Sequence, residues 1–191
     1  MRVEWVDTSW PTLLADLEAR RFDIAMSGIS ITPARAAVGC FGKAYFETAK
    51  TVLARCDVVG KYHSLASIDR PDVTVIVNPG GTNERFVREH LTHARLVTHP
   101  DNVSIFAALA KGDANLMITD RVEAELQTLA NPTLCVADGV AFEPVEKAYL
   151  MPADPHWRDW FDSWFASFRD SGAYGETLAR YLPGPAATTK R

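Results

Sequence analysis

The stretch VTVIVNPGGTNERFVREHL, residues 73–91, places a continuous apolar run directly before a polar corner and a helical pattern. The run at residues 73–77 is mostly β-branched, which is typical of a strand buried on both faces. Asn78 and Pro79 end it, and two glycines permit a sharp turn. Because such a strand needs helices on both sides of its sheet, this stretch predicts an α/β fold with a largely parallel sheet.

The rest of the chain shows the same alternation. Residues 2–6 alternate like a strand, and residues 9–21 have a helical pattern with Ser9 as the candidate N-cap. Residues 22–30 then predict a second strand, which completes a strand–helix–strand unit. Further strands are predicted at 50–56, 73–77 and 114–119, and further helices at 82–91, 102–112, 120–129 and 156–170, with a short helix after Gly172 and a frayed tail at 184–191.

The length and charge of the chain limit its partners. The 191 residues suffice for one large domain or two small lobes. No apolar run approaches the roughly 20 residues that a bilayer requires, so we expect no membrane insertion. The net charge of -4 and the absence of a basic stripe argue against nucleic acid. A small-molecule ligand is the expected partner.

The three cysteines, Cys40, Cys56 and Cys135, lack the spacing of a metal site, and at least one of them must be unpaired. A Cys40–Cys56 disulfide stays open as an alternative, because sequence alone does not fix its geometry. Neither a metal nor another cofactor is predicted. The first ten residues lack the pattern of an export signal, so the chain as written is expected to begin in the cytoplasm.

Small polar residues follow the predicted strand at 22–30. Ser27, Gly28 and Ser30 precede Arg35, and free backbone N–H groups at strand ends in α/β sheets bind anions. An arginine at such a corner can hold a carboxylate with two hydrogen bonds. The alternative is a capped turn with a solvent-exposed Arg35.

Two more corners have the same character. In the first, Asn78 and Thr82 flank the glycine turn, which lacks the spacing of a nucleotide-binding loop. In the second, Asp120 follows a strand and Glu123 lies three residues later, which is also the spacing of a helix capping box. Placed in an apolar cleft, Glu123 would instead have a raised pKa and could act as a general acid.

Together these corners resemble the polar amino-acid-binding family of periplasmic solute-binding proteins. Residues 23–35 resemble the ligand loop of that family, residues 80–86 its second-lobe anion corner, and residues 118–124 its late ligand strand. The resemblance implies that Arg35 clamps a carboxylate, with donors from Ser27, Gly28 and Ser30. It implies that Asp120 lies where the family holds the ligand's ammonium group.

The resemblance also implies the architecture. The expected fold is the type II periplasmic binding protein fold, with two α/β lobes joined by two hinge strands. Residues 1–56 and 144–191 would form the first lobe, and residues 57–143 the second. Family members carry an export signal, a first strand and a first helix before the segment that begins here, so the first lobe is expected to be N-terminally truncated and the natural location to be the periplasm.

Within the family, residues 27–35, 45–56, 77–91 and 118–126 are similar to an enzymatic branch, the cyclohexadienyl dehydratases. This likeness implies that the substrates are prephenate and L-arogenate. It implies Glu123 as the general acid, with Asn78 and Lys50 contacting the substrate. Arg35, Ser30 and Thr82 would hold a carboxylate that the ancestral binding protein used to recognise its amino acid.

Several alternatives stay open. The alternative for Lys50 is a strand lysine that faces solvent, and Trp10 either walls the substrate ring or packs in the core. The second functional hypothesis is a non-catalytic amino-acid-binding protein that serves the permease of an ABC transporter. A third is an inactive fragment. A homo-oligomer is compatible with the sequence.

Overall fold

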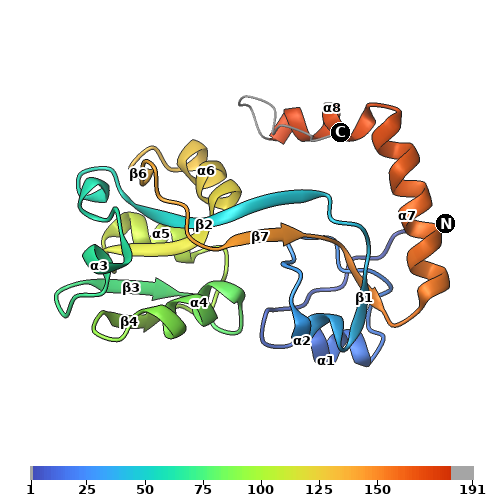
Figure 1. Cartoon of the computed structure of the whole chain (residues 1–191), viewed down its shortest axis with the longest axis horizontal. Coiled ribbons are helices and arrows are strands. Elements are labelled where there is room, and N and C mark those ends of the chain that lie inside the picture. The colour runs from blue at the N-terminus through green and yellow to red at the C-terminus, as the bar shows by residue number, and fades with distance from the viewer. Residues whose placement is uncertain (1, 182–191) are drawn as a thin grey trace.

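The computed structural model of the chain describes residues 2–181. Its main sheet has the strand order β4-β3-β5-β2-β6, and β7 pairs with another part of β2 (Figure 1). β3 pairs in parallel with β4 and β5, whereas β2 runs antiparallel to β5, β6 and β7. These strands are β2 (Phe46–Arg55), β3 (Thr74–Val77), β4 (Arg95–Thr98), β5 (Leu116–Asp120), β6 (Leu134–Val136) and β7 (Pro144–Lys147).

The prediction of a largely parallel sheet therefore holds for β3, β4 and β5 and is wrong for β2. β2 is ten residues long and enters the sheet from the other half of the molecule (Figure 1). Because β2 enters the main sheet from the opposite end, it runs antiparallel to β5, which starts within the half that contains the main sheet.

Both faces of the main sheet are buried, as the apolar runs predict. Val75 and Val77 pack into one cluster with Phe86, whereas Ile76 packs into another with Ile105. This split follows the alternation of side chains along a strand. The surrounding helices are η1 (Val59–Lys61), α3 (Leu65–Ile68), α4 (Thr82–His90), α5 (Ile105–Lys111) and α6 (Arg121–Ala130).

The other half of the molecule has its own core. Leu13, Leu17 and Leu150 form one buried cluster, and Phe161 and Phe165 belong to a second. The ten-residue strand β2 and the shorter strand β7 connect the two halves (Figure 1). The elements of this half are α1 (Leu13–Glu18), α2 (Pro33–Ala36), the paired strands β1 (Gly39–Phe41) and β8 (Leu150–Pro152), and the helices α7 (Pro155–Asp170) and α8 (Ala173–Tyr181).

The predicted strand–helix–strand unit at the start of the chain is wrong. Residues 2–6 form no strand, and the side chains of Val3 and Trp5 are 71% and 86% exposed. No strand of the described residues lies beside this segment, so its alternation has no sheet to join. Residues 22–30 form only isolated bridges with the β7–β8 segment.

The predicted cap of α1 is also wrong. Thr12 occupies the N-cap position without a side-chain hydrogen bond to the helix, and Ser9 contributes its backbone carbonyl to Thr12 and Leu13. The predicted helix at 156–170 and the predicted short helix after Gly172 are confirmed, because α7 ends before Gly172 and α8 follows it. The tail at 184–191 lies outside the described residues.

A disulfide joins Cys56 at the end of β2 to Cys135 in β6, and Cys40 is free. The Cys40–Cys56 alternative is therefore wrong. β6 pairs with β2 and brings Cys135 next to Cys56 across 79 residues of chain.

Replacing Cys56 and Cys135 together with serine is expected to lower the free energy of unfolding by about 3 kcal/mol, because the bridge closes a long loop in the unfolded chain. Urea denaturation of the variant and the native chain measures the difference. Cys40→Ser is the matched control and should change stability little. Equal stability of the double variant and the native chain would contradict this role of the disulfide.

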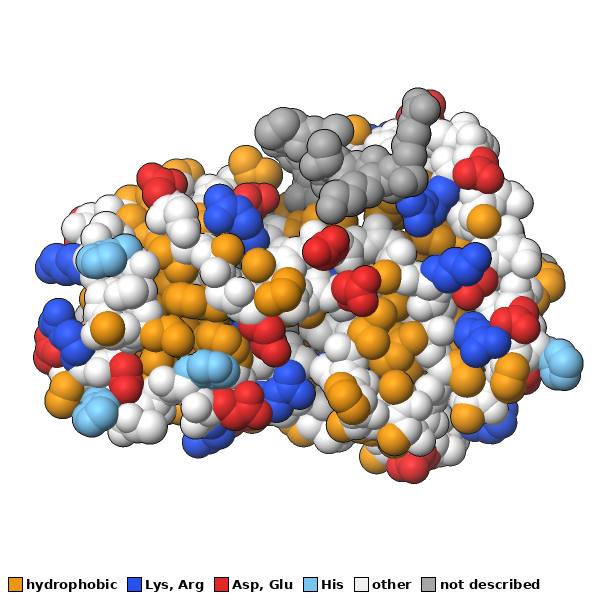
Figure 2. All heavy atoms as spheres, in the orientation of Figure 1, with side chains coloured by type: hydrophobic (Ala, Val, Ile, Leu, Met, Phe, Trp, Pro, Cys, Tyr) orange, Lys and Arg blue, Asp and Glu red, His pale blue; other side chains and the backbone are white. Residues whose placement is uncertain are grey.

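On the face shown in Figure 2, Lys and Arg side chains are interspersed with Asp and Glu side chains over both halves of the molecule. Among the described residues, no helix combines the length and the apolar character needed to cross a membrane.

Candidate functional site

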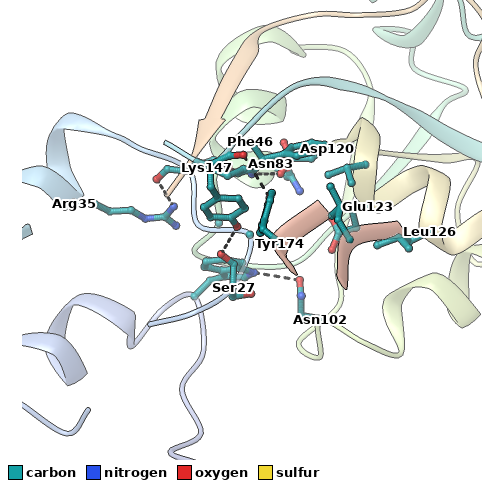
Figure 3. A pocket seen from close by; sticks show the side chains of 18 residues that line it. Ser27, Arg35, Phe46, Asn83, Asn102, Asp120, Glu123, Leu126, Lys147 and Tyr174 are labelled. Atoms are coloured by element: carbon teal, nitrogen blue, oxygen red, sulfur yellow. Dashed lines mark hydrogen bonds and ion pairs between the residues drawn. The ribbon is translucent and has the colours of Figure 1, made fainter. Parts of the chain in front are cut away.

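A cavity of about 300 Å³ lies where the two halves of the molecule meet (Figure 3). Its lining comes from the segments before α1, α2 and α5, strands β2, β5 and β7, and helices α2, α4, α6 and α8. Eight of the ten predicted site residues line it, namely Trp10, Ser27, Gly28, Ser30, Arg35, Thr82, Asp120 and Glu123.

Arg35 reaches the cavity from α2. Its side chain is buried, its Nη1 donates to the backbone carbonyl of Ser30 at 3.0 Å, and its guanidinium lies 5.1 Å from the centroid of the Trp10 ring. The solvent-exposed alternative for Arg35 is thus wrong. Burial lowers the pKa of Arg35, and the positive charge of Arg85 lowers it further, while Asp120 raises it. An arginine stays protonated under these conditions, so a cation faces the cavity.

A buried carboxylate between two buried lysines forms the centre of the site. Asp120 accepts a hydrogen bond from Lys147 on Oδ2 and, at 3.4 Å, from Lys50 on Oδ1. The side chains of Lys50 and Lys147 are 0% and 3% exposed. The Lys147 ammonium group also donates to the hydroxyl of Ser30 at 2.8 Å. It therefore links Asp120, in the main sheet, to Ser30 in the other half of the molecule. Both oxygens of Asp120 are consequently engaged by ammonium groups of the chain itself.

Lys50 lies behind the cavity wall rather than in solvent. It sits on β2 opposite Asp120 on β5, and its Nζ donates to Asn83 Oδ1 at 2.6 Å and to Thr82 Oγ1 at 3.3 Å. The solvent-facing alternative is therefore wrong. Burial lowers the pKa of Lys50, and the adjacent Asp120 carboxylate opposes that shift.

Glu123 lies in the first turn of α6 and lines the cavity. Burial raises the pKa of its carboxyl group, as predicted, and Asp120 raises it further. The hydroxyl of Thr119 hydrogen-bonds to Glu123 Oε2, which lowers the pKa in part. The capping-box alternative is wrong, because Asp120 makes no side-chain hydrogen bond to the start of α6.

The structure does not bring Asn78 into the cavity. Its Nδ2 donates to the backbone carbonyls of His99 and Pro100, both at 3.0 Å. The amide of Asn83, in the first turn of α4, lines the cavity instead. Asn83 lies between Lys50 and Thr119, with 3.1 Å from its Nδ2 to Thr119 Oγ1.

Sequence reasoning missed Asn83, Lys147, Tyr45 and Tyr174. Asn83 lies in the same corner as Asn78, one helical residue beyond Thr82, and a test of which polar side chains face the strand ends would have selected it. Lys147 lies in β7, where an alternating pattern places it on the buried face. No local signal identifies Tyr174, because α8 reaches the cavity only through the packing of α7 and α8.

Aromatic side chains cover part of the cavity wall. Trp10, Tyr45, Phe46 and Tyr174 line it, and they come from segments far apart in the sequence (Figure 3). The Trp10 indole donates to Asn102 Oδ1 at 3.2 Å. This hydrogen bond joins the segment before α1 to the half that contains the main sheet.

Gly80 and Pro11 form a second close approach between the halves. Gly80 has φ +82, and a Cβ at this position would lie 2.7 Å from the backbone nitrogen of Pro11. A side chain there meets fixed backbone atoms, so the two halves must separate to accommodate it.

Gly80→Ala is expected to raise KM, or weaken ligand binding, about tenfold, because the added methyl group pushes the halves apart and disfavours the arrangement that encloses the ligand. Ligand titration by calorimetry measures the change. Gly139→Ala is the control, because Gly139 also has a positive φ but open space around its Cβ position. Equal effects of the two variants would mean that backbone strain alone accounts for the result.

The site combines one protonatable acid with a positively charged, enclosed surface. With Glu123 neutral, the cations of Arg35, Lys50 and Lys147 and the single anion of Asp120 leave two positive charges. Such a cavity favours a dianionic ligand with an aromatic or ring-shaped body. Glu123 can deliver a proton to that ligand.

Comparison with known proteins agrees with this geometry. The sequence profile of the bacterial extracellular solute-binding proteins, family 3, matches residues 1–184. The chain is 44% identical over 178 residues to the cyclohexadienyl dehydratase of Pseudomonas aeruginosa. That match covers 93% of this chain and 66% of the relative, so the chain spans slightly less than two thirds of the length of that enzyme.

Solved structures share the fold. An ancestral amino-acid-binding protein, a precursor of cyclohexadienyl dehydratase, superimposes with a TM-score of 0.85 at 29% identity, over 94% of this chain and 78% of that one. An amino acid ABC transporter substrate-binding protein from Streptococcus pneumoniae bound to L-arginine also has a TM-score of 0.85, over 93% of this chain and 75% of its own. At 23% identity, the latter shows the fold alone.

Proposed function

Because the chain belongs to the bacterial extracellular solute-binding proteins of family 3 and has the type II periplasmic binding protein fold, we propose that it is a cyclohexadienyl dehydratase, a carbon–oxygen lyase. Its substrate is prephenate, with L-arogenate as the second substrate. The lobes are residues 1–56 with 144–191 and residues 57–143, and the reaction occurs between them.

The reaction needs one proton and a place for two negative charges. Prephenate carries two carboxylates and a ring hydroxyl. The bond from the ring to one carboxylate breaks, and its electron pair enters the ring as carbon dioxide leaves. The C–O bond to the hydroxyl breaks with its pair on oxygen, which takes a proton and departs as water. Phenylpyruvate remains, and aromaticity supplies the driving force.

Glu123 is the general acid, and its position carries the proposal. Its pKa is raised by burial, so the carboxyl group retains a proton at a higher pH than an exposed glutamate does. A binding protein has no use for a protonated acid in the ligand cavity, whereas dehydration requires one. After each turnover, solvent returns the proton when the lobes separate.

The other polar residues of the site bind the substrate carboxylate and orient the leaving hydroxyl. Arg35 and the hydroxyls of Ser30 and Thr82 hold the carboxylate that remains in the product. Lys50 orients the Asn83 amide, which is linked to the acid through the Thr119 hydroxyl and steers the leaving hydroxyl. We assign this role to Asn83 instead of Asn78, because the Asn78 amide is bound to backbone carbonyls away from the cavity.

The alternative is a non-catalytic amino-acid-binding protein that delivers its ligand to an ABC permease. The contacts of Asp120 weigh against it, because Lys50 and Lys147 already occupy both carboxylate oxygens. A ligand ammonium at Asp120 would be the third cation beside one carboxylate, which favours prephenate over L-arogenate and over free amino acids. A thermal-shift panel separates the two functions: phenylpyruvate should stabilise the chain, and L-arginine should not.

The disulfide supports function outside the cytoplasm. Bridges such as Cys56–Cys135 persist in oxidising compartments, and the family is extracellular. We therefore propose the periplasm as the location.

The activity is tested by incubating prephenate with the chain and quantifying phenylpyruvate against an enzyme-free blank. Phenylpyruvate formation in proportion to protein concentration supports the dehydratase. The same assay with L-arogenate and detection of L-phenylalanine tests the second substrate. No product above the blank from either compound, with tight binding of one amino acid, would establish the binding protein instead.

A further inference from the structure

Thr119 is a fully buried hydroxyl residue beside the acid, at the penultimate position of β5. Its Oγ1 hydrogen-bonds to Glu123 Oε2 and lies 3.1 Å from Asn83 Nδ2. The roles of the acid and the cations leave this hydroxyl unexplained.

The direction of each hydrogen bond in this series is determined by Lys50. An ammonium group only donates, so the atom of Asn83 that faces Lys50 at 2.6 Å must be the amide oxygen. The Asn83 NH₂ group then points to Thr119 and donates to its oxygen. The one proton of the Thr119 hydroxyl is left for Glu123, so Oε2 of Glu123 is an acceptor.

An acceptor at Oε2 places the acidic proton on the other oxygen. Oε1 has no hydrogen-bond partner among the described residues, and the Glu123 side chain lines the cavity. We propose that Thr119 is the positioning residue of the general acid, whose hydroxyl holds Glu123 so that the transferable proton is on Oε1 and available to the leaving group. This inference rests on the proposed function of Glu123.

The groups around Glu123 determine how loss of the Thr119 hydroxyl changes the pKa of Glu123. Burial raises the pKa of Glu123, Asp120 raises it, and Lys147 and Lys50 lower it. The Thr119 hydroxyl lowers it as well, because its hydrogen bond favours the ionised carboxylate. Removing the hydroxyl therefore raises the pKa and frees the carboxyl group to rotate.

Thr119→Val replaces the hydroxyl with a methyl group of similar size. We expect the low-pH plateau of kcat for prephenate to fall on the order of tenfold, because the proton is no longer directed at the leaving group. The alkaline limb of the kcat profile should move to higher pH by about one unit. Thr119→Ser retains the hydroxyl and should restore both values.

Thr51→Val is the matched control. Thr51 lies opposite Thr119 in the sheet, is equally buried, and donates to the carbonyl of Val140 at 2.7 Å. The Thr51→Val substitution removes one buried hydrogen bond without changing a contact of Glu123. The pH profile of kcat should therefore keep its position, even if the melting temperature falls.

Carboxyl NMR provides a readout that does not require turnover. The chain is labelled with ¹³C at the glutamate side-chain carboxyl carbon, and the Glu123 signal is assigned by its loss in Glu123→Gln. The Glu123 pKa should rise in Thr119→Val and stay constant in Thr51→Val. An unchanged pKa in Thr119→Val, or equal shifts in the two valine variants, would overturn the inference. An inactive native chain would contradict the proposed dehydratase, while the titration would still decide whether Thr119 orients Glu123.

Discussion

Glu123→Gln is expected to lower kcat for prephenate by roughly 10²- to 10⁴-fold, the usual contribution of a positioned general acid. The amide keeps the size of the side chain and can still accept the hydrogen bond from Thr119. It cannot transfer a proton to the leaving hydroxyl. Binding should be retained, because Arg35 and the hydroxyls of Ser30 and Thr82 hold the carboxylate of the substrate. Stopped-flow or steady-state assays of phenylpyruvate formation give kcat, and calorimetry with phenylpyruvate gives affinity.

Glu125→Gln is the matched control for this variant. Glu125 is on the same helix, two residues away, and pairs with Arg121 at the exposed surface. Its replacement should leave kcat within about twofold of the native value, as expected for a surface pair that contributes little. A Glu123→Gln variant with native kcat would show that another group, or water, supplies the proton.

Asp120→Asn is expected to lower the free energy of unfolding by about 3 to 5 kcal/mol, because removing one partner leaves buried charges uncompensated. Lys50 and Lys147 both depend on this carboxylate, and both side chains are buried. Urea denaturation at neutral pH measures the loss. Asp159→Asn, which breaks an exposed pair with Arg158, should have little effect.

The stability of Asp120→Asn should also depend on pH in a defined direction. Burial already lowers the pKa of Lys50 below 10.5, and Asp120 opposes that shift. Without Asp120 the pKa of Lys50 in the folded state falls further, so between that value and 10.5 the unfolded chain binds more protons. The variant should therefore gain stability relative to the native chain as the pH rises into the alkaline range. If the stability difference between Asp120→Asn and the native chain stays constant with pH, the lowered pKa of Lys50 is not the cause.

Local sequence patterns predicted β2, β3 and β5 and the helices α4, α5 and α6, but not the short strands β4, β6 and β7. The β-branched run at Val75–Val77 is buried on alternate faces by α4 and α5, so composition and alternation together determine its place. Residues 2–6 alternate as a strand does but have no neighbouring strand among the described residues. A strand requires a partner, and a single-segment pattern does not contain that information.

The candidate site was predictable where a residue follows a strand. Asp120 and Glu123 lie at the end of β5 and line the cavity, whereas Arg35 lines it from α2, which follows no strand. The choice between Asn78 and Asn83 depends on the direction of each side chain at the corner, which the β3–α4 geometry determines. Lys147 and Cys135 reach their partners only through the pairing of distant segments with β2, and no spacing in the chain indicates those contacts.

The pH dependence of phenylpyruvate formation by the native chain tests the proposed dehydratase and its acid most directly. We predict turnover of prephenate above the enzyme-free blank, with kcat at a plateau at low pH. We predict a fall in kcat as the pH rises through the pKa of Glu123, which burial places above the ordinary 4.5. A rate that increases over the same range would contradict a protonated acid at Glu123, and no phenylpyruvate above the blank would contradict the dehydratase itself.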